Sequence, residues 1–175
     1  MSFILLILFT GAIEMIKTLK HKYKADLIII SDANSVYIEE SLKNAGIYDE
    51  FTKIFTNPAE FTPEGRLTVT PFTNQTQSPN CAKNMCKGTV LQDYIKNSAQ
   101  EYSFICYAGD GGNDFCPIQR LSENDLAFVR KGFALEAKIP KMKETKGLEV
   151  KSQVHLWEDS NDIMTVINSK LDSTD

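Results

Sequence analysis

The chain has 175 residues, 42% of them hydrophobic and 24% charged, which is typical of a globular protein and not of a disordered, collagen-like or coiled-coil chain. A chain of this length can bury a sizeable core without disulfide or metal staples, so we expect one domain over residues 1–175. The formal net charge of −4 argues against nucleic acid as a partner, because binding its phosphates needs a basic surface.

An apolar run over residues 3–9 opens the chain. It lacks a basic residue before it and a small-x-small cleavage site after it, and it is too short to span a bilayer. We therefore favour a buried strand there over a signal sequence, and we expect no membrane partner. Where the domain starts within residues 1–12 stays open.

Apolar periodicity and turn residues predict alternating helices and strands along the rest of the chain. In chain order we expect a helix over 13–23, a strand over 25–30, a helix over 36–45, a strand over 51–56, a helix over 83–97, a strand over 103–107, a short helix over 118–121, strands over 126–129 and 154–157, and a helix over 163–171. Ser35 is the expected cap of the helix over 36–45. The segment 57–80 holds four of the six prolines and predicts a surface hairpin or long excursion.

Short apolar strands that alternate with helices indicate a parallel sheet covered on both faces, which is a doubly wound α/β domain. We expect Trp157 and the ten phenylalanines in its core. Ligands of such sheets bind beyond the carboxyl ends of the strands. Polar clusters occur at two of these ends, directly after residue 30 and after residue 108.

The cysteines do not follow a framework. Cys81, Cys86, Cys106 and Cys116 include no CxxC pair and no regular spacing. This usage is typical of reduced thiols, so we expect a cytoplasmic protein.

The loop from Gly109 to Asp114 follows a predicted strand and precedes a predicted helix. Its three glycines allow a ligand to approach the backbone closely. Asp110 and Asp114 are hard oxygen ligands of the kind that Mg²⁺ takes in proteins. The alternative is an aspartate- and glycine-rich turn with no ligand.

Ser31 follows the other apolar strand and can direct its hydroxyl toward an anion, and Asp32 and Asn34 offer polar groups to the same crevice. Helix capping is the alternative for this cluster. Lys87 stands near the start of a predicted helix, where it could face a phosphoryl group or simply lie on the surface. A strand-end hydroxyl, a lysine and a glycine-rich pair of aspartates in this order are typical of a phosphoryl-transfer site.

Four strings of the sequence resemble the phosphoethanolamine/phosphocholine and pyridoxal-phosphate phosphatases of the haloacid-dehalogenase superfamily. They are IIISDAN at 28–34, FTNP at 55–58, CAKNMCK at 81–87 and GDGGNDFCP at 109–117. The resemblance extends from about residue 13 to residue 171. It implies a Rossmann-like, Mg²⁺-dependent phosphomonoesterase whose substrate is a small phosphorylated metabolite.

The resemblance also implies roles for single residues. Ser31 would hold the transferring phosphoryl group and Lys87 would balance its charge. Asp32, with Asn34 beside it, would contact substrate. Asp110 would bind Mg²⁺ with support from Asp114 and Asn113.

One departure from this family affects catalysis. Its members carry an Asp-x-Asp motif whose first aspartate attacks phosphorus, and that motif occurs nowhere in the 175 residues. The helical cap that normally lies before Ser31 is also largely missing. We therefore expect either a truncated phosphatase or a divergent member that hydrolyses esters poorly. Ser78 stands where relatives tend to have a further cysteine, which argues against a thiolate metal site.

Two other functions stay open. A non-catalytic phosphate-binding or regulatory module would keep the affinity for anions without turnover. A plain interaction domain would use the same loops for structure alone. The oligomeric state is not predicted by the sequence.

Overall fold

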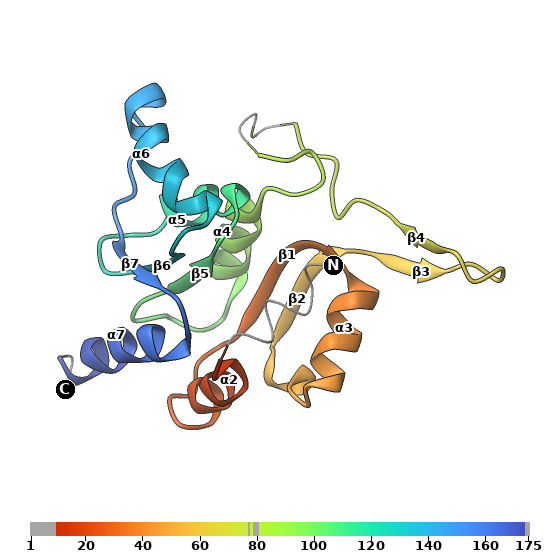
Figure 1. Cartoon of the computed structure of the whole chain (residues 1–175), viewed down its shortest axis with the longest axis horizontal. Coiled ribbons are helices and arrows are strands. Elements are labelled where there is room, and N and C mark those ends of the chain that lie inside the picture. The colour runs from red at the N-terminus through yellow and green to blue at the C-terminus, as the bar shows by residue number, and fades with distance from the viewer. Residues whose placement is uncertain (1–9, 77, 79–80, 174–175) are drawn as a thin grey trace. The chain divides into compact units, whose positions relative to one another are not determined.

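The structure, a computed structural model, describes residues 10–76, 78 and 81–173 (Figure 1). The strand expected over 3–9 lies outside the described residues. The chain divides into two compact units: the first comprises Met1–Thr76 with Lys83–Met85, and the second comprises Gln77–Ala82 with Cys86–Asp175. The single domain expected over 1–175 stays a prediction.

The first unit is built around two parallel strands. In chain order its elements are α2 (Ala12–His21), β1 (Ile28–Asn34), α3 (Ser35–Asn44), the 3-10 helix η1 (Tyr48–Glu50), β2 (Lys53–Asn57), β3 (Ala59–Phe61) and β4 (Leu67–Val69). β1 pairs with β2, and α3 connects them (Figure 1). Ile38 and Leu42 of α3 and Ile47 form a buried cluster that packs against Ile29 of β1 and Ile54 of β2.

β3 and β4 form an antiparallel hairpin within the segment 57–80. Phe61 on this hairpin is 60% exposed, so the expectation that all ten phenylalanines lie in the core is wrong there. The hairpin has only two strands, and such a ribbon has no second layer of its own to bury its side chains. Phe133 is also exposed, and its ring lies against the Arg130 guanidinium at 4.3 Å. Trp157 is buried as expected.

The second unit contains a three-stranded parallel sheet with the order β5-β6-β7. Its elements are α4 (Lys87–Asn97), β5 (Cys106–Gly109), the 3-10 helix η2 (Gly112–Asp114), α5 (Phe115–Gln119), β6 (Leu126–Arg130), α6 (Ala134–Lys146), β7 (Gln153–Trp157) and α7 (Ser160–Asp172). Residues 126–129 of the central strand β6 are all buried. Burial of successive residues is typical of a parallel strand covered on both faces. The parallel pairs in both units confirm the α/β class.

Several predicted boundaries are wrong: the strand expected over 25–30 is Ile28–Asn34, and the short helix expected over 118–121 is Phe115–Gln119. At two further elements, tertiary hydrogen bonds replace local ones. The helix expected over 83–97 begins at Lys87, since the carbonyls of Lys83 and Asn84 accept the amides of Gln75 and Thr73. The strand expected over 103–107 is Cys106–Gly109, and the Ile105 amide donates to the Asp125 carboxylate.

The start of α3 also differs from the prediction, and there the cause is a local cap. Its N-cap is Asn34 and not Ser35, because the Asn34 side chain accepts the Tyr37 amide. Ser35 is the first helical residue, and its hydroxyl pairs with the backbone of Ala59.

Among the described residues, no helix combines the length and the apolar character that crossing a membrane requires.

Candidate functional site

The Asp114 carboxylate, in the 3-10 helix η2 that follows β5, accepts four hydrogen bonds. Its Oδ1 accepts hydrogen bonds from Lys87 Nζ at 2.8 Å and from the Tyr107 hydroxyl at 2.7 Å. Its Oδ2 accepts the backbone amides of Asp110 at 3.2 Å and Gly111 at 2.9 Å. The side chains of Lys87 and Asp114 are only 9% and 5% exposed. A buried carboxylate is tolerated when it is paired and its lone pairs are filled, and both conditions hold here.

A glycine at the end of β5 makes this arrangement possible. A Cβ atom at Gly109 would lie 2.7 Å from the Cβ of Asp114 and 2.8 Å from its Cγ. Real Cβ atoms do not approach other heavy atoms this closely, so any other residue would push Asp114 away. Gly109 is therefore required for the carboxylate to fold back onto the amides of its own loop.

Asp110 differs from Asp114 in the same loop. Its side chain is 35% exposed, and its Oδ2 lies 3.9 Å from Arg130 Nη1, which is a long ion pair. Its carbonyl accepts the Leu135 amide and so fixes the backbone of the loop. Because its carboxylate is partly exposed at the carboxyl end of a parallel strand, Asp110 can meet a ligand that arrives from solvent.

A second lysine contacts the loop from α6. Lys138 Nζ donates to the Gly112 carbonyl at 2.7 Å. With Lys87 and Arg130, it places three cationic side chains around a loop that carries two carboxylates. This surrounding charge favours an anionic ligand there.

The polar cluster of the first unit lies in an irregular part of β1. Ile30 pairs with Phe55 and Asn34 pairs with Asn57, so residues 31–33 stand opposite a single residue, Thr56. This bulge lifts the chain out of regular pairing. Ser31 Oγ accepts the Ala33 amide at 3.2 Å, and Asp32 is exposed. Ser31 and Asp32 therefore lie on a bulged turn within the last residues of β1, whereas the sequence predicted that the strand ends before them.

Asn57 at the end of β2 holds this turn in place. Its Nδ2 donates to the carbonyls of Asp32 at 2.6 Å and Ala33 at 2.7 Å. Its Oδ1 accepts the Phe72 amide at 2.9 Å and Asn84 Nδ2 at 3.2 Å. Asn57 is buried, and every one of its contacts is to a residue distant in the sequence. It is the residue that fixes the backbone after Ser31.

The structure thus brings Lys87, Asp114 and the backbone of Asp110 together within the second unit. Asn34 lies in the first unit and is committed to capping α3. Two supporting residues were missed by the sequence analysis. Tyr107 was taken only as a strand residue, and Asn57 only as part of a matching string. The signal that could have found Asn57 is a polar residue at the end of a buried parallel strand.

The comparisons with known proteins agree with each other. The model of the Putative Phosphatase family matches residues 5–171. The chain is 40% identical over 161 residues to the pyridoxal phosphate phosphatase PHOSPHO2 of Mus musculus, a match that covers 89% of this chain and 66% of that protein. It is 35% identical over 149 residues to the phosphoethanolamine/phosphocholine phosphatase of Gallus gallus, covering 83% of this chain and 55% of that protein.

The chain therefore spans less than two thirds of the length of these relatives. Within that span the family match includes both polar turns, the one after Ile30 and the one after Ala108. Because the family model covers nearly the whole sequence and several relatives exceed 30% identity, the chain belongs to the Putative Phosphatase family.

Proposed function

We propose that this chain carries the phosphoryl-binding and Mg²⁺-binding residues of a phosphatase that acts on small phosphate monoesters. The observation that carries the proposal is the loop after β5, where Asp114 is fixed by Lys87 and Asp110 keeps a partly exposed carboxylate. The names of the relatives supply the substrate class: pyridoxal phosphate for one, and phosphoethanolamine or phosphocholine for the other. The proposed fold is the Rossmann-like type of the haloacid-dehalogenase superfamily, with the helical cap largely missing.

The donor chemistry of the loop fits Mg²⁺. Asp110 offers a hard carboxylate oxygen, whereas the two oxygens of Asp114 already accept four hydrogen bonds. Mg²⁺ is commonly bound through one or two carboxylates and keeps waters and substrate phosphate as its other ligands. Asp110 is therefore the proposed main ligand. Asp114 is the proposed secondary ligand, which can bind the cation only in exchange for one of its hydrogen bonds. When bound, the cation would neutralise the charge of the substrate phosphate.

Ser31 and Lys87 are the proposed phosphoryl-binding side chains. Ser31 Oγ accepts one amide, so its own O–H can still donate to a phosphate oxygen. The Lys87 ammonium has three donors and gives one to Asp114. Asp32 and Asn34 are the proposed substrate contacts. Because the side-chain oxygen of Asn34 caps α3, its NH₂ group is the better placed of its two polar groups to make that contact.

Turnover by these 175 residues should be poor. The printed sequence contains no Asp-x-Asp, and neither Ser31 nor Lys87 supplies the carboxylate that attacks phosphorus in this superfamily. The same observation favours a second function, a phosphate-binding module without catalysis. Both functions share the binding step, and they differ in whether the phosphate ester is hydrolysed.

One experiment separates them. Phosphate release from pyridoxal phosphate, phosphoethanolamine and phosphocholine is measured with Mg²⁺. In a parallel assay, vanadate binding is detected through the rise that it causes in the temperature of thermal unfolding. We expect vanadate to raise the unfolding temperature, less so in Ser31→Ala, with turnover below about 1 s⁻¹, the lower end of the usual enzyme range. Faster turnover that Asp110→Asn abolishes and Asp93→Asn preserves would establish catalysis and refute the impairment. No vanadate binding and no turnover would refute the proposed phosphoryl site.

A further inference from the structure

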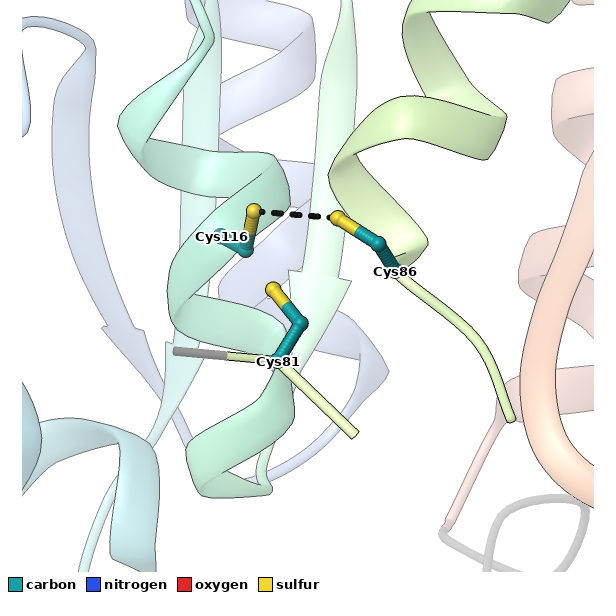
Figure 2. Close-up of side chains that lie close together, drawn as sticks. All are labelled: Cys81, Cys86 and Cys116. Carbon is teal, nitrogen blue, oxygen red and sulfur yellow. Dashed lines mark hydrogen bonds between the residues drawn. The ribbon is translucent and has the colours of Figure 1, made fainter. Parts of the chain in front are cut away.

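Three of the four cysteines gather in one place in the second unit. The sulfur atoms of Cys81, Cys86 and Cys116 all lie within 4.8 Å of one another, and the Sγ atoms of Cys86 and Cys116 are 3.5 Å apart (Figure 2). Figure 2 shows the three side chains pointing toward a common centre. The sequence analysis found no framework among the cysteines, because two short segments separated by 29 residues of chain supply them.

Close packing of two helices brings Cys116 to the start of α4. A Cβ atom at Gly88 would lie 2.8 Å from Cys116 Sγ and 2.9 Å from Arg120 Cδ. Glycine is unfavourable inside a helix by about 1 kcal/mol relative to alanine. At this position it is the residue that allows α5 to place its cysteine against α4.

The polar groups around Cys86 favour a negative charge on its sulfur. Thr89 Oγ1 donates to Cys86 Sγ at 3.2 Å, and Arg120 Nη2 lies 3.8 Å from the same atom. Burial opposes ionisation of Cys86, but hydrogen bonds from Ser78 and Thr89 outweigh it and lower the pKa of this thiol to about 6. Burial, with the neighbouring sulfurs, raises the pKa of Cys81. Cys86 is therefore the cysteine of the cluster whose surroundings most favour a thiolate.

We propose that Cys81, Cys86 and Cys116 bind one thiolate-preferring divalent cation such as Zn²⁺. Zn–S bonds of about 2.3 Å in a tetrahedral site place the sulfurs about 3.8 Å apart, close to the separations seen here. A dication that replaces the thiol protons of the cluster removes the repulsion that three adjacent thiolates would otherwise have. A disulfide between Cys86 and Cys116 would leave Cys81 without a role.

The cluster also has a route for the cation. Ser78, Cys81 and Cys116 line a cavity of about 220 Å³, which has room for water or another fourth ligand. Three protein ligands with a position open to such a cavity are typical of an accessible zinc site, whereas four protein ligands close it. The absence of a fourth cysteine at position 78 therefore does not exclude a thiolate site.

The cation would tie the start of α4 to the start of α5. Cys86 directly precedes Lys87, and Cys116 stands two residues after Asp114. The buried ion pair between Lys87 and Asp114 joins the same two helix ends. The proposed metal would therefore stabilise the loop after β5, independently of whether that loop binds phosphate.

The test compares single Cys→Ser variants at 81, 86 and 116 with Cys106→Ser, which changes the one cysteine outside the cluster. Each protein is reduced, stripped of metal and titrated with Zn²⁺ against a chromophoric chelator. Losing an outer-shell partner of a metal ligand weakens binding by 10–100-fold, so loss of a ligand itself should weaken it more than about 100-fold. Cys106→Ser should match the wild type.

A second measurement needs no variant. Thiol-reactive reagent is added to the folded wild type with and without Zn²⁺, and modified cysteines are located by mass spectrometry. We expect Zn²⁺ to protect Cys81, Cys86 and Cys116 and to leave the reactivity of Cys106, whatever its level without metal, unchanged. Binding should weaken as the pH falls, because protons compete for the thiolates. Equal Zn²⁺ affinity in all variants, or no protection in the folded wild type, would overturn the proposal.

Discussion

The turn at Ser31–Asn34 and the loop at Gly109–Asp114 occupy corresponding places in the two units, each at the carboxyl end of a parallel strand. They are held differently. The turn depends on neutral hydrogen bonds from Asn57 to two backbone carbonyls. The loop depends on a buried ion pair between Lys87 and Asp114.

The difference shows how each segment compensates its polar groups for the hydrogen bonds to water that they lose on burial. Backbone carbonyls need only a donor, which one asparagine supplies. A buried carboxylate needs a charge partner as well, and it becomes costly once that partner is removed. The loop should therefore be far more sensitive to substitution than the turn.

The largest effect is expected from Lys87→Met, which leaves Asp114 buried without its cation. The free energy of unfolding, measured by urea denaturation, should fall by about 3–5 kcal/mol. The matched control is Lys43→Met, which removes an exposed lysine that pairs with Glu39 on the surface of α3. The control should unfold almost as the wild type does. Equal behaviour of the two variants would show that burial of the loop's ion pair is unimportant.

Removal of Asn57 should rank second. Asn57→Ala leaves the part-buried carbonyls of Asp32 and Ala33 without this donor. A fully buried polar group left unsatisfied costs roughly 1–3 kcal/mol, and because these two are only part-buried we expect the total loss to stay within that range. Chemical denaturation measures the loss. Asn97→Ala removes an exposed asparagine whose amide donates to Asp93, and it should change stability little. A loss for Asn57→Ala larger than that for Lys87→Met would reverse the comparison.

A smaller loss is expected at the helix cap. Asn34→Ala removes the side chain that accepts the Tyr37 amide, and such a change costs about 1 kcal/mol. Thermal unfolding and far-ultraviolet circular dichroism provide the measurement. Asn34→Asp keeps an accepting oxygen and should retain most of the stability. If Asn34→Ala and Asn34→Asp unfold at the same temperature, capping is not what Asn34 contributes.

The smallest effect on stability is expected for Asp110→Asn. The Asp110 carboxylate is partly exposed and its ion pair with Arg130 is long, so the unfolding transition should barely move. Its Mg²⁺ affinity, measured by calorimetry, should nevertheless fall. Asp114→Asn should instead lower the stability clearly, because it removes the charge that pairs with Lys87. Unchanged Mg²⁺ affinity in Asp110→Asn would show that Asp110 is not the main Mg²⁺ ligand.

Local pattern was enough for much of the fold. Apolar runs and turn residues predicted the strands over 126–129 and 154–157 to within one residue at each end, and the strand over 51–56 to within two. The glycine-rich string at 109–114 marked a polar loop after a strand, because only a few residue types allow such a turn. Boundaries were wrong where distant groups intervene, as at Lys83 and Asn84, whose carbonyls pair with residues 75 and 73.

The sequence by itself determined the α/β class, the family and the positions of Ser31, Lys87, Asp110 and Asp114 at element ends, since these depend on short strings and their order. Only the tertiary structure decided which aspartate is committed and which is open, because Lys87 reaches Asp114 across 27 positions of the chain. The roles of Asn57 and the three gathered cysteines were decided in the same way. Hydrogen bonds and sulfur contacts act over a few ångströms, and the chain reveals such distances only once it is folded.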